Sequence, residues 1–207
     1  MIPVRVLAVR YLAGASPALC RALGAPEGYS SLGMLTTDCD DATYIALDAA
    51  TKAADVEVSY GRSFYAGAAN ASTPNAGEVI GILAGQTPGA VRSGMDAALA
   101  ALQRVGFEET GGVPFLAHTV SSVGSFLAKE AQVPLGSAIA YLIAPPLEGM
   151  YAMDAALKAA DVRLCKLYAP PSETNFGGGL LSGTQSACEA ACVAFREKVA
   201  EVAAQPL

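Results

Sequence analysis

Asp48-Ala-Ala-Thr-Lys-Ala-Ala-Asp-Val56 returns almost half a chain later as Asp154-Ala-Ala-Leu-Lys-Ala-Ala-Asp-Val162, with eight of the nine positions identical. Each copy is predicted to end an apolar helix and to lead into a strand. The spacing is far longer than the roughly 20–50 residues of a solenoid unit, so the repeated element is a small domain. The chain of 207 residues is therefore predicted to hold two related domains, residues 1–109 and 110–207.

The two halves share one predicted order of strands and helices. In the first half we expect strands over residues 4–12, 31–36, 56–60 and 78–83, and helices over 16–24, 42–54 and 87–105. In the second half we expect strands over residues 115–121, 138–144, 162–168 and 180–181, and helices over 123–131, 146–160 and 185–202. Each half is thus a compact α+β unit, and the polar segment 108–112 is predicted to link them.

The composition favours a protein that buries much surface against other subunits. Hydrophobic residues make up 53% of the chain and charged residues only 15%. A net charge of −6 and the absence of Trp disfavour nucleic acid and favour a neutral or cationic small partner. No stretch is long enough for a membrane span, and the first residues lack a signal-peptide pattern, so a reducing cytoplasm is expected.

Motifs of the common enzyme classes are absent from the sequence. There is no phosphate-binding glycine loop, no HExxH zinc motif and no GxSxG nucleophile motif. His118, the only histidine, falls in an apolar strand pattern, which favours a structural role. Cys188 and Cys192 are expected to share a buried helix face, and Asp48 is expected to pair with Lys52 at i,i+4 spacing.

One acidic segment, Thr36-Thr-Asp-Cys-Asp-Asp41, stands above this background. Converging carboxylates of Asp38, Asp40 and Asp41, with Glu78 from another strand, can bind an ammonium group or a divalent metal. Capping of the following helix is the other interpretation, and it accounts for Asp41 in particular. Both interpretations stay open.

Two long segments rich in Gly, Ala, Ser and Pro occupy equivalent places in the two halves. They are Gly61–Asn75 and Ala169–Gly179, and both are predicted to be loops. Long structureless loops in compact domains tend to be functional or mobile, although an ordinary solvated connection is the alternative.

Six blocks along the chain carry a more specific pattern: residues 31–44, 60–68, 76–79, 141–148, 170–176 and 182–188. Together they resemble the tandem-domain shell proteins of bacterial microcompartments, in particular those of ethanolamine utilisation. The resemblance covers nearly the whole chain, and it is weakest at the short N-terminus and over Gly106–Val113.

The resemblance implies two circularly permuted microcompartment domains and a flat homotrimer that mimics a hexamer. The internal repeat supports this independently, because three copies of a duplicated domain give pseudo-sixfold symmetry. The resemblance further implies a structural, non-enzymatic tile of a shell in the bacterial cytoplasm. Its partners would be other shell proteins, with no cofactor, metal, membrane or nucleic acid.

The resemblance also implies two kinds of pore. The positions that match a small acidic pore, which would hold a small amino alcohol such as ethanolamine, are Asp40, Glu78, Phe107 and Ser182. The positions that match the gate of a central pore are Gly61, Arg62, Ser63, Phe64, Tyr65, Ala66 and Gly67.

Two other functions remain open at the level of the sequence. One is a cytoplasmic, oligomeric sensor that binds a small ligand between duplicated domains. The other is a metal-dependent enzyme that uses Asp38, Asp40 and Asp41. Assembly separates these functions, because a tile forms extended sheets whereas a sensor or an enzyme stays a discrete oligomer.

Overall fold

The structure, a computed structural model, describes residues 1–64, 78–170 and 175–205, which form two compact units. The N-terminal unit holds Pro3–Gly106 and Gly124–Leu127. The C-terminal unit holds Met1–Ile2, Phe107–Val123 and Ala128–Leu207. Both units mix helices with an antiparallel sheet, which confirms the predicted α+β class. The division into domains at residues 109 and 110 stays a prediction.

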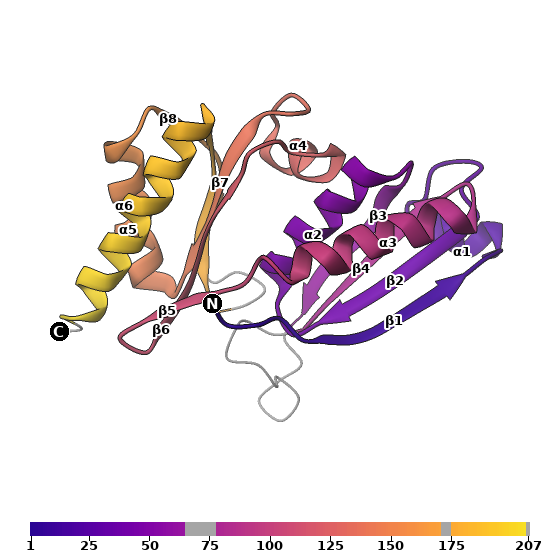
Figure 1. Ribbon diagram of the computed structural model, residues 1–207, viewed down its shortest axis with the longest axis horizontal. Coiled ribbons are helices and arrows are strands. Elements are labelled where there is room, and N and C mark those ends of the chain that lie inside the picture. Colours follow the sequence, from indigo (N-terminus) through magenta and orange to yellow (C-terminus); the bar gives the residue numbers. More distant parts are fainter. Residues whose placement is uncertain (65–77, 171–174, 206–207) are drawn as a thin grey trace. The chain divides into compact units, whose positions relative to one another are not determined.

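The N-terminal unit is a four-stranded antiparallel sheet in the order β1-β2-β4-β3. Its elements are β1 (Val6–Leu12), α1 (Pro17–Ala22), β2 (Ser31–Thr37), α2 (Asp40–Ala53), β3 (Glu57–Phe64), β4 (Glu78–Gly85) and α3 (Pro88–Leu102). Helices α2 and α3 lie side by side on one face of this sheet (Figure 1). Close packing depends on Gly81, because a Cβ there would lie 3.0 Å from Cδ2 of Leu47.

The C-terminal unit is a five-stranded antiparallel sheet in the order β5-β6-β7-β9-β8, with α5 and α6 packed together against it (Figure 1). The second half of the chain forms β5 (Glu108–Thr110), β6 (Val113–Val120), α4 (Ser125–Ala131), β7 (Ala138–Ala144), α5 (Pro146–Ala159), β8 (Val162–Tyr168), β9 (Gly177–Gly183) and α6 (Gln185–Ala203). Cys188 and Cys192 are buried on α6, as predicted. His118 lies in β6, where its predicted strand is found.

The segment predicted as a linker is instead a β-hairpin. Strand β5 pairs with β6, with Thr110 opposite Val113. The two turn residues, Gly111 and Gly112, have φ of 57° and 80°, and positive φ at both positions suits the tight turn of a two-residue hairpin. The prediction was wrong because a Gly-Gly pair between polar residues serves equally well as a linker or as such a turn.

Part of each predicted loop belongs to a strand. Strand β3 continues through Gly61 to Phe64, which pairs with Glu78 of β4, and β9 already begins at Gly177. Small and glycine residues in these strands hide the two-residue alternation that indicates a strand. The rest of the first predicted loop, residues 65–75, lies outside the described residues. No helix among the described residues is long and apolar enough to span a membrane.

Candidate functional site

The acidic segment forms the turn between β2 and α2. The N-cap of α2 is Cys39, and its side chain makes no capping hydrogen bond. The hydroxyl groups of Thr37 and Thr43 lie 2.6 Å apart. The Thr37 hydroxyl lies 2.9 Å from the Cys39 carbonyl oxygen, and the Thr43 hydroxyl lies 2.7 Å from it. The predicted capping by Asp41 is therefore wrong, because the helix already begins at Asp40 and Asp41 lies inside its first turn.

The carboxylate of Asp38 is held by Arg5 of the segment before β1. The Arg5 backbone N–H donates to Oδ1 at 2.7 Å, and the Arg5 Nε donates to Oδ2 at 3.2 Å. Asp38 thus ties the chain before β1 to the end of β2. Among the described residues, no group of three or more His, Cys, Asp or Glu side chains could hold a metal ion.

Asp40 is a buried carboxyl group on the first turn of α2. Its Oδ1 accepts the Asp41 backbone N–H at 2.9 Å, and the Ser63 hydroxyl also donates to the carboxylate. Burial raises the pKa of Asp40 from 3.8 to about 6, while these hydrogen bonds lower it in part. Asp40 is thus mainly ionised at neutral pH, yet it titrates much closer to neutrality than an ordinary Asp.

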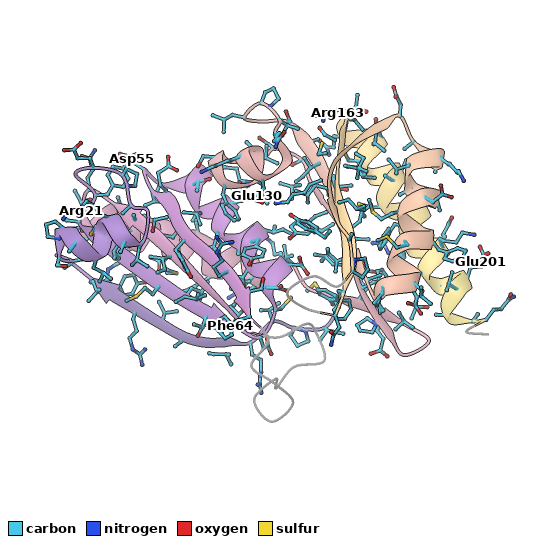
Figure 2. The ribbon with its side chains drawn as sticks, turned by 180° about the vertical axis from the view of Figure 1, so that it is seen from behind. Arg21, Asp55, Phe64, Glu130, Arg163 and Glu201 are labelled. Atoms are coloured by element: carbon cyan, nitrogen blue, oxygen red, sulfur yellow. The ribbon has the colours of Figure 1, made fainter. Side chains whose placement is uncertain are left out.

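Ser63 connects Asp40 with the end of the sheet. Its hydroxyl is also 2.6 Å from the Tyr44 hydroxyl on α2, and its backbone pairs with Val79 of β4. The next pair along the ladder joins Phe64, labelled at the end of β3 in Figure 2, with Glu78. The N-terminal unit therefore places the Asp40 carboxylate near the strand positions of Phe64 and Glu78. The side chain of Glu78 is outside the described part of the structure.

The other two predicted pore residues, Phe107 and Ser182, belong to the C-terminal unit. The Phe107 ring is fully buried and meets the Phe176 ring edge-on, with 5.6 Å between centroids. Ser182 lies on β9, where its hydroxyl donates to the Ala138 carbonyl oxygen at 3.0 Å. The donor of Ser182 is thus occupied, while its oxygen can still accept a hydrogen bond.

The predicted gate begins in ordered sheet. Gly61, Arg62, Ser63 and Phe64 are strand residues of β3, and Tyr65, Ala66 and Gly67 lie outside the described residues. Side chains alternate along β3, so Arg62 and Phe64 share one face while Gly61 and Ser63 share the other. A Cβ on Gly61 would lie 3.4 Å from the Tyr44 ring, so this second face packs closely against α2.

The repeat holds a contact that sequence reasoning missed. The predicted pair of Asp48 and Lys52 is confirmed at 3.2 Å, but Asp48 is also fully buried. Its Oδ2 accepts the Gly124 N–H at 2.8 Å, and its Oδ1 accepts the Leu127 N–H at 2.9 Å. Asp48 therefore binds the turn that leads into α4. The contact of Asp40 with Ser63 was equally hidden, because nothing in the sequence aligns α2 with β3.

Comparison with known proteins gives matches along the whole chain. Residues 31–111 match the family model described as BMC domain. The bacterial microcompartment shell protein EutL of Clostridium perfringens is 55% identical over 211 residues, which cover 100% of this chain and 97% of that protein. EutL of Escherichia coli is 47% identical, covering 100% and 96%. The crystal structure of ethanolamine utilization protein EutL from Leptotrichia buccalis has a TM-score of 0.93 at 55% identity, covering 100% and 97%.

Proposed function

This chain belongs to the EutL family of bacterial microcompartment shell proteins, and from that membership we propose that it works as a trimeric tile whose pores pass small molecules. The family resemblance and the shell function predicted from the sequence are confirmed by full-length identity of 55%. The proposal adds the trimeric assembly, the pores and the ligands of the pores to this shell function.

A homotrimer is the assembly that best suits a duplicated chain. Each copy brings two α+β units, so three copies give a ring of six similar units. We therefore assign one sixth of the ring to residues 1–109 and one sixth to residues 110–207. Other shell proteins would adjoin the rim of the tile.

The small acidic pore is assigned to Asp40, Glu78, Phe107 and Ser182. The buried Asp40 carboxylate is the observation that carries this assignment, because a buried charge calls for a partner. An ammonium ion supplies that partner, and the Ser182 oxygen can accept from a hydroxyl group. Both features fit an amino alcohol such as ethanolamine.

The gate of the central pore is assigned to residues 61–67. Arg62 and Phe64 on one face of β3 would lead into the opening, and Phe64 is already exposed. A role without catalysis agrees with the engagement of Asp38 by Arg5, which removes one carboxylate from any reactive cluster.

Assembly tests this function directly. Light scattering at micromolar concentration is expected to give the mass of three chains, and electron microscopy is expected to show extended sheets under crowded conditions. A stable monomer or dimer would exclude the tile. A trimer that never forms sheets, alone or with other shell proteins, would favour the small-ligand sensor.

A further inference from the structure

The two aspartates of the repeat lie in opposite environments. The Asp48 side chain is fully buried, whereas 64% of the Asp154 side chain is exposed, although each pairs with the lysine four residues on. The difference extends along the helices. On α5, Leu147 and Tyr151 are 71% and 64% exposed and lie two turns and one turn, respectively, before Asp154. We call these three residues the α5 stripe.

The same stripe on α2 is buried within the N-terminal unit. Its members, at matching positions of the repeat, are Asp41, Ile45 and Asp48, and all are at most 7% exposed. Asp48 is covered by the turn Gly124–Leu127, whose backbone N–H groups it accepts. Helix α5 thus carries an apolar and acidic stripe whose counterpart on α2 is covered.

The turn Gly124–Leu127 has its own counterpart, Ser16–Leu19. The loops around the two turns close with similar backbone hydrogen bonds. Two of them match in position: the Val133 N–H donates to Ala128 as the Ala25 N–H does to Cys20, and the Ser137 N–H donates to Pro134 as the Tyr29 N–H does to Pro26. The Val123 N–H donates to Ser137, and the Ala15 N–H donates to Ser30, which lies one position further along. These bonds align Gly124 with Ser16 and Leu127 with Leu19. Leu127 is 1% exposed, whereas Leu19 is 41% exposed. The turn Ser16–Leu19 therefore also lacks the cover that the turn Gly124–Leu127 has.

Hydrogen-bonding groups on the helix beside the stripe and on the turn change together. In the covered contact, the Ser125 N–H donates to the Thr51 hydroxyl at 3.1 Å. The residue that matches Ser125 is Pro17, which has no N–H, and the residue that matches Thr51 is Leu157, which has no acceptor. Removing both partners leaves no group unsatisfied, whereas removing only one would leave a buried group unpaired. Pro17 and Leu157 are thus suited to face each other.

We propose that the α5 stripe of one copy of this chain binds the turn Ser16–Leu19 of a second copy, with Asp154 accepting the Ser16 N–H and Leu19 packing beside it. This inference rests on the proposed self-assembly and names the contact that holds it. The stripe and the turn are different surfaces, so the contact is heterologous and runs head to tail, as a closed ring requires. It is not an exact copy, because Ser16 has a Cβ where Gly124 has none.

Disulfide trapping tests the contact. Ser16→Cys and Asp154→Cys are combined in a Cys165→Ser background, which removes the one partly exposed native cysteine. Oxidation is expected to join the wild-type-like trimer into covalent dimers and trimers on a non-reducing gel. The matched control combines Asp154→Cys with Ser93→Cys on the exposed side of α3, and it is expected to stay monomeric on the gel.

A second variant tests the contact even if the double-cysteine protein fails to fold. Leu19→Arg changes an exposed side chain, so each chain is expected to fold while light scattering shows loss of the trimer. Val193→Arg, on an exposed apolar position of α6, is the control that keeps the trimer. A trimer that neither cross-links nor responds to Leu19→Arg overturns this contact and leaves the tile intact. A wild-type chain that forms no trimer overturns both proposals.

Discussion

The Asp48 carboxylate accepts the backbone N–H of Leu127 at 2.9 Å, although 79 positions separate the two residues. With the second bond, from Gly124, this contact places four residues of the second repeat in the N-terminal unit. A fully buried carboxylate that satisfies two backbone donors acts as a cap supplied from a distant helix. The contact therefore gives α2 a structural role for which its repeat partner α5 shows no counterpart among the described residues.

Asp48→Ala is expected to lower the free energy of unfolding by about 2–4 kcal/mol, because it leaves the N–H groups of Gly124 and Leu127 buried without acceptors. Asp48→Asn keeps one acceptor and is expected to lose less. Denaturant unfolding measures both changes at a fixed protein concentration. Asp96→Ala, at an exposed position of α3, is the control and is expected to change stability by under about 0.5 kcal/mol. Equal effects of Asp48→Ala and Asp96→Ala would contradict the capping role.

Gly124→Ala is expected to destabilise the same contact by about 1–3 kcal/mol through overpacking. A Cβ at Gly124 would lie 2.7 Å from the Asp48 carbonyl oxygen and would also collide with the Thr51 hydroxyl. The backbone atom cannot move without shifting α2. Gly14→Ala is the matched control, because a Cβ there meets no atom within 4 Å. Thermal unfolding of the two variants compares them, and a Gly124→Ala protein as stable as Gly14→Ala would show that the turn is loosely packed.

The repeat and the helices and strands with regular apolar spacing could be predicted from the sequence, but the contacts between residues far apart in the chain could not. Helices α2 and α5 were predictable because alanine-rich apolar spacing and the i,i+4 Asp–Lys pairs are local signals. The extension of β3 to Phe64 was not, since it depends on pairing with β4. Likewise, the Asp48 contact and the bond from Ser63 to Asp40 join residues that no local pattern relates. Nearly identical repeat sequences could not reveal that Asp48 is buried and Asp154 exposed.

Protonation of Asp40 is expected to stabilise the fold. Its pKa is about 6 in the folded chain against an ordinary 3.8, so the folded state binds the proton more tightly than the unfolded state. The resulting stabilisation is complete below pH 3.8 and is lost as the pH rises through about 6. The unfolding free energy of the wild type minus that of Asp40→Asn is therefore expected to fall by up to about 3 kcal/mol between pH 4 and 7.5. A difference that is flat across this range would refute the raised pKa.

Ethanolamine is expected to bind weakly, through its ammonium group at Asp40 and Glu78. Two unit charges ~4 Å apart at an effective dielectric constant of ~20 attract by ~4 kcal/mol. Desolvation and lost freedom of motion offset much of this, which leaves a dissociation constant in the millimolar range, or about −4 kcal/mol. Weak binding also suits a conduit, because the ligand must leave on the other side. Calorimetric titration of the wild type at pH 7.5 measures the constant.

Asp40→Asn with Glu78→Gln is expected to abolish this binding while the mass in light scattering stays that of the wild type. The charge-matched control, Asp96→Asn with Glu27→Gln, changes two exposed positions and is expected to bind as the wild type does. Lowering the pH to 5 should weaken wild-type binding about tenfold, because a carboxyl group with a pKa of about 6 is then only about one-tenth ionised. Binding that survives both the double substitution and the acidic pH would place the ammonium site elsewhere and leave Asp40 as a structural carboxyl group between α2 and β3.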